Sequence, residues 1–144
     1  AAEWADWGGF KLEANDSVKA NMAITEAFGA RAMIHSDSAL GAQRLNQEVA
    51  KAMYAGRASG IPITEEQAIR WLTINPAWEL GLDDKIGSLE VGKNADVVLW
   101  SGNPFSIYTK AEKVWIDGAL LFDRSDPTQR WRTDFELGTV KEGN

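Results

Sequence analysis

A short apolar run near the start of the chain ends in polar residues that could carry chemistry. Ala32-Met33-Ile34 is followed by His35, Ser36, Asp37 and Ser38. A buried strand that ends in this way is typical of the mouth of an α/β barrel or sheet, where such folds place catalytic groups. Asp37 could act as a metal ligand or as a general base toward a metal-bound water. Its side chain could equally cap the loop that follows, which is a common use of aspartate.

His35 is the second candidate of this segment. It lies two residues before Asp37, so the two side chains point to the same side if the strand extends that far. They would then share one site. The alternative is a histidine that is hydrogen-bonded within the protein, because a zinc site usually needs three or four protein ligands. The sequence offers one histidine and no cysteine.

The remaining candidate motifs have explanations without catalysis. Glu65-Glu66 falls in the first turn of an expected helix, where negative charge interacts favourably with the helix dipole. Asp83-Asp84 falls in an expected loop, where solvent surrounds both carboxylates. The run Gly87-x4-Gly92-Lys93 faintly resembles a phosphate-binding loop. We exclude that function, because Asn94 stands where Ser or Thr is needed and no helix follows.

The elements before the His35–Asp37 segment predict an αβ unit. Ser17 is expected to cap a helix that runs to about Phe28, and Gly29 is expected to end it. A short buried strand at 31–34 follows. Helix, glycine, strand and polar loop in this order are typical of a parallel α/β architecture. Residues 1–14 are expected to be mostly loop, with a short strand.

Three helical segments are expected after the candidate site. The first covers about 42–55 and ends at Gly56 and Gly60. Thr64 and Gln67 form a capping box that opens the second, which runs to about residue 74. Asn75 is expected to cap a further short turn, with Pro76 at its first position.

The second half of the chain is expected to be β. Strands are predicted at 87–92 and 95–100, and the continuous apolar run 97–100 predicts burial on both faces. Residues 114–116 and 119–122 predict a hairpin around Asp117-Gly118, a type I′ turn signal. The chain from Arg124 onward is polar and is expected to wrap the surface.

Composition narrows the class of protein. A chain of 144 residues with 44% hydrophobic and 25% charged residues can form one ordinary globular domain with a core. The net charge of −6 and the lack of a basic cluster argue against nucleic acid and anionic membranes as partners. No apolar run approaches membrane-spanning length. The absence of cysteine fits both cytoplasm and periplasm, so the compartment stays open. Because the sequence begins at Ala1, we expect a fragment or a processed protein.

Seven tryptophans are a high number for this length. Their unrelated spacings favour burial in a core or an interface, where tryptophan contributes most. Stacking on sugars or bases is the alternative.

Five segments together resemble the C-terminal portion of the amidohydrolase superfamily, and most closely its imidazolonepropionase-like metal-dependent hydrolases. They are residues 34–38, 73–77, 80–82, 86–99 and 114–118. The resemblance runs from about residue 20 to residue 124. Its specificity lies in the order and spacing of the segments, since none of them would be specific alone.

The resemblance implies a fold and a set of roles. Residues 1–81 would form the last αβ units of a (β/α)8 barrel, 82–124 the C-terminal share of a small β-sandwich, and 125–144 a polar tail. Asp37 would end the eighth barrel strand, bind or face the catalytic metal, and carry a proton between the attacking water and the leaving group. His35 and Ser38 would lie near the substrate or support Asp37.

The sequence also departs from the family pattern. The family's other metal ligands are a His-x-His pair and single histidines on further strands, and this sequence has no residues to match them. The chain is also shorter than the ~250 residues of a whole barrel. The first hypothesis is therefore a C-terminal part of a metal-dependent amidohydrolase that hydrolyses amide, lactam or dipeptide-like C–N bonds. A divalent metal, zinc, would be bound only in the complete enzyme, and the isolated chain would be inactive.

The partners follow from the same hypothesis. They would be the missing barrel portion or a second copy of the chain, with a small-molecule substrate in the complete enzyme. The alternative hypothesis is a non-enzymatic binding or self-associating module that reuses this part of the fold, since truncated barrels leave strand edges and apolar faces open.

Overall fold

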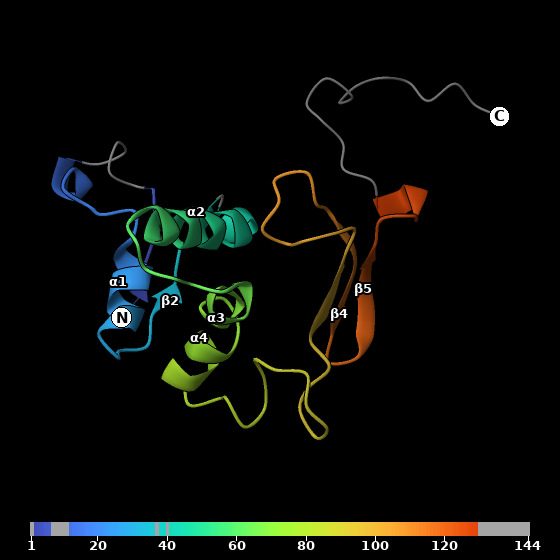
Figure 1. Ribbon diagram of the computed structural model, residues 1–144. Helices are drawn as coiled ribbons and strands as arrows, with labels where there is room; N and C mark the ends of the chain where they lie inside the picture. The colour runs from blue at the N-terminus through green and yellow to red at the C-terminus, as the bar shows by residue number, and fades with distance from the viewer. Residues whose placement is uncertain (1, 7–11, 37, 40, 130–144) are drawn as a thin grey trace, which may run out of the picture.

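The computed structural model combines a helical part with a three-stranded sheet, as Figure 1 shows. It describes residues 2–6, 12–36, 38, 39 and 41–129. The helical part contains β1 (Ala2–Glu3), α1 (Asn21–Ala27), β2 (Met33–Ile34), α2 (Leu45–Ala58), α3 (Glu65–Arg70) and α4 (Ile74–Glu79). The sheet contains β3 (Val97–Trp100), β4 (Ala111–Ile116) and β5 (Ala119–Asp123), and short 3-10 turns occupy Leu12–Ala14, Gly41–Arg44 and Pro127–Gln129. The α/β class is confirmed.

The first half contains the predicted αβ unit. β1 and β2 pair in parallel, with Ala2 opposite Met33 and Glu3 opposite Ile34, and α1 lies between them in the chain. The prediction that Ser17 caps α1 is wrong, because the helix begins only at Asn21. The side chain of Asn21 instead donates to the carbonyl of Trp4 at 2.8 Å, which ties the start of α1 to the end of β1.

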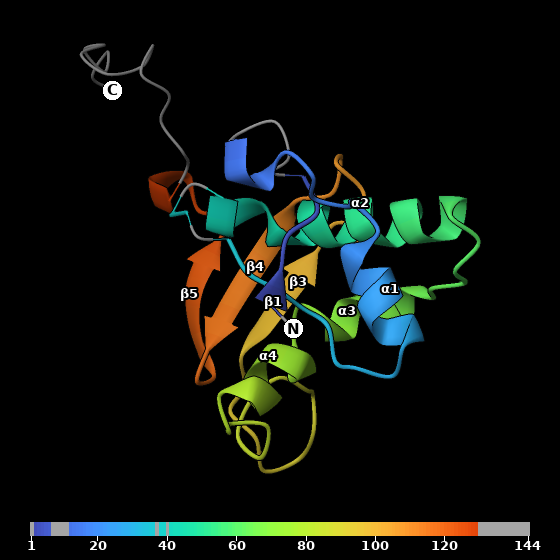
Figure 2. The same cartoon turned by 90° about the vertical axis from the view of Figure 1, so that its left-hand side faces the viewer.

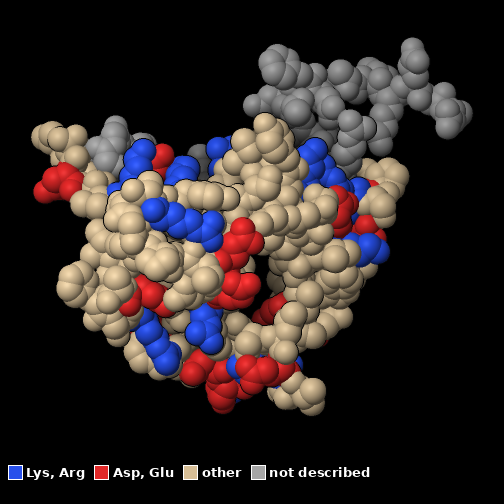
Figure 3. Space-filling model, viewed as in Figure 1, with Lys and Arg blue, Asp and Glu red and all other residues tan. Residues whose placement is uncertain are grey.

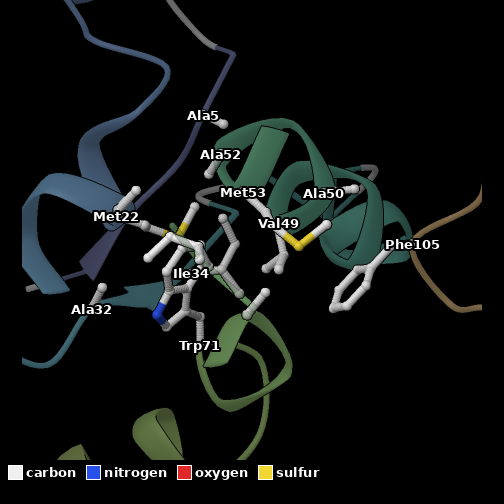
Figure 4. Packing of buried hydrophobic residues seen from close by; sticks show 13 residues of the cluster. Ala5, Met22, Ala32, Ile34, Val49, Ala50, Ala52, Met53, Trp71 and Phe105 are labelled. Carbon is white, nitrogen blue, oxygen red and sulfur yellow. The ribbon is translucent and has the colours of Figure 1, made fainter. Parts of the chain in front are cut away.

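The core of the helical part lies between α1, β2, α2 and α3 (Figure 4). Its largest fully buried side chains are Trp71, Met22, Met53 and Val49. The indole N–H of Trp71 donates to a carboxylate oxygen of Glu26 at 2.7 Å, and its carbonyl accepts the backbone N–H of Ile34 at 3.0 Å. Trp71 therefore links α1 to β2. Its burial agrees with the expectation that tryptophans lie in a core or an interface.

One loop links the sheet to this core. Phe105, from the connection between β3 and β4, is buried in the cluster of the helical part. Next to it, the side-chain amide of Asn46 on α2 donates to the carbonyl of Pro104 at 2.6 Å. The sheet is thus attached to α2 by a buried aromatic ring and a hydrogen bond.

Gly56 does not end the second helix, contrary to the prediction. It lies inside α2 and is buried, and Gly60 provides the positive φ (83°) just after the helix. A Cβ added to Gly56 would stand 2.4 Å from the Cβ of Ala23 on α1. Gly56 therefore permits the close approach of α1 and α2. The sequence pattern alone does not distinguish a glycine with this role from one that ends a helix.

Replacing Gly56 by Ala is expected to lower the free energy of unfolding, because overpacking a well-packed core costs about 1–3 kcal/mol. Helix propensity returns ~1 kcal/mol of that cost, so we expect a net loss of up to about 2 kcal/mol. Urea denaturation measures the change. The double variant Gly56→Ala/Ala23→Gly removes the contacting methyl group and should be more stable than Gly56→Ala alone. A Gly56→Ala variant as stable as the wild type would contradict the close contact.

The capping box is confirmed at the start of α3. The backbone N–H of Thr64 donates to the Gln67 side chain at 2.8 Å, and the N–H of Gln67 donates to the Thr64 hydroxyl at 3.2 Å. Asn75, in contrast, is not a helix cap. It lies within α4, is buried, and donates to the carbonyl of Ala32 at 2.8 Å. The Asn75 side chain, which the local sequence predicted to be a helix cap, thus forms a tertiary hydrogen bond to the residue before β2.

The sheet has the strand order β3-β4-β5, antiparallel throughout (Figure 2). The predicted hairpin is confirmed, since Asp117 and Gly118 both have positive φ (51° and 79°), as a type I′ turn requires. The predicted strand at 87–92 is wrong, because these residues form turns. The expected burial of 97–100 on both faces is wrong as well: Val98 and Leu99 are 40% and 49% exposed.

Asp123, the last residue of β5, has a carboxyl group whose hydrogen bonds lower its pKa. Hydrogen bonds from the side chain and backbone of Ser125, and then from Lys113, lower the pKa of Asp123 from its usual 3.8 to about 2. Because the folded pKa lies below the unfolded one, the stabilisation is present above pH 3.8 and is lost as the pH falls through about 2.

We expect an NMR titration of the Asp123 carboxyl to give a pKa of about 2, and Ser125→Ala to raise it toward 3.8. Thr128→Ala is the matched control, because Thr128 hydrogen-bonds Asp126 instead. It should raise the pKa of Asp126 and leave that of Asp123 low. An unshifted Asp123 in the wild-type chain would contradict the contacts at this end of β5.

Candidate functional site

The carboxyl ends of β1 and β2 meet at Trp4 and His35. Each of these residues directly follows its strand, and the parallel register places the two strand ends side by side. The rings of Trp4 and His35 pack edge to face, with centroids 4.4 Å apart and an interplanar angle of 65°. His35 is half-buried. The predicted location of His35 at a strand end is therefore confirmed, and Trp4 is its aromatic neighbour.

The loop after β2 is shaped by its serines. The Ser36 hydroxyl accepts the backbone N–H of Ser38 at 3.3 Å, and the Ser38 hydroxyl accepts that of Gly41 at 3.2 Å. The carbonyl of Ser38 also accepts the N–H of Ala42 at 2.9 Å. Ser38 thus stabilises the turn that leads into the 3-10 segment before α2. Capping of this loop is the alternative role that the sequence predicts for Asp37.

Asp37, the leading candidate, lies outside the described residues. Its side-chain direction, and the prediction that it points to the same side as His35, are therefore untested. β2 ends at Ile34, so His35 and Ser36, which are described, follow the carboxyl end of the strand. Side chains at that end of a strand reach the mouth of a parallel α/β fold.

A charged cluster that the sequence reading missed lies just after β1. Asp6 forms ion pairs with Lys19 at 3.4 Å and with Lys51 of α2 at 3.3 Å. Lys51 also bonds Glu48 at 2.6 Å, one helical turn away. The hydrogen bond from Lys51 is the main cause that lowers the pKa of Asp6. Only the Glu48–Lys51 spacing (i, i+3) could have signalled this cluster, because its link to Asp6 is tertiary.

Lys51 stays charged in this cluster although it is partly buried. Burial lowers the pKa of Lys51, but the hydrogen bonds and charges of Glu48 and Asp6 outweigh it and raise the pKa overall. The second carboxylate oxygen of Glu48 is buried without a hydrogen-bond partner. The cluster therefore keeps Lys51 charged and clamps the end of β1 onto α2.

The described part of the chain does not form a metal site. No group of three or more His, Cys, Asp or Glu side chains within it could hold a metal ion. His35 has an aromatic ring as its neighbour, and the Asp6 carboxylate, just after β1, is paired with Lys19 and Lys51. Zinc sites need at least three protein ligands, so the described residues do not fit such an ion.

The other paired carboxylates lie in the elements predicted for them. Glu65 and Glu66 lie in the first turn of α3, where the backbone N–H of Glu66 and then the hydroxyl of Thr64 lower the pKa of Glu66. Both oxygens of Glu65 accept the Asn103 side-chain amide at 3.0 Å. Asp83 and Asp84 lie in a turn, but only Asp84 is exposed as expected, because Asp83 is half-buried. These carboxylates therefore have roles in the helix start and in loops.

Comparison with known proteins assigns the chain to a family. Residues 13–136 match the sequence profile of the amidohydrolase family. The chain belongs to the amidohydrolase family. This amidohydrolase chain is 54% identical over 39 residues to an imidazolonepropionase of Shewanella oneidensis and 46% identical over 63 residues to an N-acetylglucosamine-6-phosphate deacetylase of Vibrio furnissii. These matches cover 27% and 44% of the chain.

The fold agrees with this assignment. A crystal structure of an amidohydrolase from Thermotoga maritima superposes with a TM-score of 0.70 and 37% sequence identity over 80% of the chain. The chain covers 10% of the imidazolonepropionase, 14% of the deacetylase and 29% of the Thermotoga protein. This amidohydrolase chain therefore spans a minor part of the length of the proteins that it matches.

Two surface features complete the description. On the face drawn in Figure 3, Lys and Arg are interspersed with Asp and Glu, without a continuous basic patch. In the described ranges, no helix combines the length and the apolar character needed to cross a membrane.

Proposed function

We propose that this chain supplies the end of one barrel strand, with Asp37, to the active site of a metal-dependent amidohydrolase that hydrolyses C–N bonds. The observation that carries the proposal is the pair of parallel strands whose carboxyl ends meet at Trp4 and His35, within a chain of this family. β1 and β2 would be the last two strands of a (β/α)8 barrel. The sheet β3–β5 would be the C-terminal share of a small β-sandwich over residues 82–124.

Asp37 has the leading role in this proposal. As a carboxylate just past a buried strand, it would serve as a metal ligand and carry a proton between water and the leaving group. A bound zinc ion would supply the activated water. Because the described residues contain no set of three ligands, most of the metal's ligands would come from residues outside this sequence. The isolated chain would then be inactive.

His35 and Ser38 would support this site rather than perform the reaction. The contact between the rings of His35 and Trp4 fixes the half-buried imidazole at the strand end, within two residues of Asp37. The Ser38 hydroxyl holds the turn through its bond to Gly41. We assign His35 to the substrate side of the site and Ser38 to the positioning of the Asp37 loop.

The substrate class follows from the relatives and not from the geometry. An imidazolonepropionase and a deacetylase are among the similar proteins, which supports amide, lactam or dipeptide-like C–N bonds. The loops that select a substrate differ between members of a fold, so the proposal concerns the class of bond and not one substrate.

The experiment is an activity screen of the product of the complete reading frame that contains this chain. The panel would hold small amides, lactams, N-acetylated sugars and dipeptides, each measured with and without a zinc chelator. We expect chelator-sensitive hydrolysis of at least one C–N bond. Hydrolysis that the chelator leaves unchanged, or activity on none of these classes, would overturn the proposal.

A second candidate function is a self-associating module without activity. The exposed apolar side chains of the sheet favour it, because apolar surface left open on a sheet is often covered by a partner. They are Val98, Leu99, Ile116, Leu120 and Leu121, exposed by 40–58%. Sedimentation of the purified chain over a range of concentrations tests this candidate, and a monomer at all concentrations would exclude it.

A further inference from the structure

A small hollow of about 320 Å³ lies where the chain enters β2, at the end of that strand opposite to His35. Its walls come from the end of α1, the turn to β2, the last residue of α3, the start of α4 and the turn after α4. Figures 1 and 2 show these segments at the same end of the helical part. Pockets that hold small ligands begin at about 300 Å³, so this hollow has room for a ligand of few atoms.

Hydrogen bonds between the elements fix the walls of this hollow. The buried side chain of Asn75 donates to the carbonyl of Ala32 at 2.8 Å, which joins α4 to the start of β2. The indole of Trp71 donates to one carboxylate oxygen of Glu26 at 2.7 Å, and the backbone N–H of Gly29 donates to the Glu26 carbonyl at 2.9 Å. The walls are therefore in place before a ligand arrives, which lowers the entropy cost of binding.

The charged side chains around the hollow are of both signs. Among the described residues they are the carboxylates of Glu26 and Asp83 and the guanidinium groups of Arg31 and Arg70. The two negative and two positive charges cancel, so the hollow as a whole favours neither a simple anion nor a simple cation. Complementary charge then selects a small ligand that carries one charge of each sign.

Two of these charged groups are available to a ligand. Within the described part of the chain, neither Asp83 nor Arg70 forms a hydrogen bond or an ion pair through its side chain, although both line the same hollow. Asp83 is also half-buried. A carboxylate that is partly removed from water is usually paired, because its desolvation costs free energy. An ammonium group in the hollow would supply the partner that Asp83 lacks there.

The other side of the hollow suits a carboxylate and a short apolar group. A guanidinium group matches the two oxygens of a carboxylate with two parallel N–H donors. The guanidinium of Arg31 lies 4.2 Å from the centre of the Trp78 ring, a contact that limits its movement. The apolar part of the lining is small and includes Ala30 and Ile74.

We propose that this hollow binds a free α-amino acid with a small apolar side chain. The ammonium group of the ligand would lie beside Asp83, and its carboxylate would accept hydrogen bonds from Arg31 and Arg70. Its side chain would contact Ile74. The hollow and His35 lie at opposite ends of β2, so this site differs from the candidate site and does not depend on the proposed activity.

An NMR titration of the full chain with L-alanine tests the proposal. The backbone amides of Gly29, Ala30 and Arg31 should shift with a Kd of about 1 mM, as for a ligand of few atoms. N-acetyl-L-alanine lacks the ammonium charge and L-alanine amide lacks the carboxylate. Each should bind at least about tenfold more weakly than L-alanine, because one charge-assisted hydrogen-bonding group is lost.

Two variants test the residues. Asp83→Asn and Arg70→Gln should each weaken L-alanine binding by about tenfold. The matched controls are Asp84→Asn and Arg44→Gln, which remove the same charges at exposed positions outside the hollow. They should change the Kd by less than about twofold. Unchanged positions of the remaining amide signals show that each variant keeps its fold.

Three results would overturn the proposal. The first is the absence of any shift of these amides at about 10 mM L-alanine, tenfold above the expected Kd. The second is equal binding of L-alanine and either analogue, which would show that the hollow selects a single charge. The third is wild-type binding by both Asp83→Asn and Arg70→Gln, which would place the ligand elsewhere on the chain.

Discussion

Replacing Asp37 by Asn in the complete reading-frame product is expected to lower kcat for C–N hydrolysis by about 10²- to 10⁴-fold, the contribution typical of a positioned acid or base. Asparagine keeps the size of the side chain and removes its ionisable oxygen. The loss should appear in kcat rather than in KM, because proton transfer contributes in the transition state and not to ground-state binding. Steady-state kinetics with the best substrate of the activity screen measures both constants.

The control for this variant is Asp84→Asn. Asp84 is exposed in the turn after α4 and lies outside the proposed site. It should retain wild-type kinetics. Both variants should keep the wild-type unfolding midpoint, so that a kinetic loss is not a folding defect. An Asp37→Asn enzyme with unchanged kcat would remove Asp37 from the reaction.

Replacing Trp71 by Ala is expected to lower the free energy of unfolding by about 3–5 kcal/mol, as for other large aromatic side chains cut back in a core. Trp71 is fully buried and belongs to the cluster drawn in Figure 4. The change opens a cavity and also leaves the Glu26 carboxylate without the indole donor. A loss of this size approaches the total stability of many small domains, so the variant should be largely unfolded or close to it. Urea denaturation followed by circular dichroism measures it.

Two variants separate packing from the hydrogen bond. Trp71→Phe keeps most of the apolar volume and removes the N–H, so it should cost less than Trp71→Ala. Trp78→Ala is the surface control, because Trp78 is 44% exposed and contacts the Arg31 guanidinium at 4.2 Å. Such a cation–π contact is worth about 0.5–1 kcal/mol. Equal losses for Trp71→Ala and Trp78→Ala would contradict the placement of the core.

Features with local causes could be predicted from the sequence. The capping box at Thr64 and Gln67 depends on two residues three apart, and the hairpin turn depends on Asp117-Gly118 adopting positive φ. The strand before His35 follows from an apolar run bounded by a glycine and polar residues. Each signal and its structural result lie within a few residues of one another, so these features form without a distant partner.

The predictions that failed depended on distant partners. Asn75 has the sequence context of a cap, but a buried carbonyl of Ala32 takes its amide. Gly56 has the composition of a helix stop, but Ala23 on another helix requires its small size. The run 97–100 has the pattern of a doubly covered strand, yet within the described ranges its sheet contains three strands and two of its residues are exposed. Periodicity reports which faces are apolar and not what covers them.

In the candidate site, too, local features could be predicted and contacts between distant residues could not. His35 could be placed at a strand end from its sequence context, but its contact with Trp4 brings together residues 31 positions apart. The clamp of Asp6 by Lys51 likewise joins the end of β1 to α2. Neither contact leaves a mark in the local sequence, since the first joins the ends of two paired strands and the second joins the segment after β1 to α2.

The central claim is that this chain holds one part of a metal site whose other ligands lie elsewhere. The zinc content of the purified chain, measured by mass spectrometry after loosely bound metal is removed, tests it most directly. We predict far less than one zinc ion per chain, and at least one in the complete reading-frame product. One tightly bound zinc ion per isolated chain, lost in Asp37→Asn, would contradict the claim and show that these residues form a metal site by themselves.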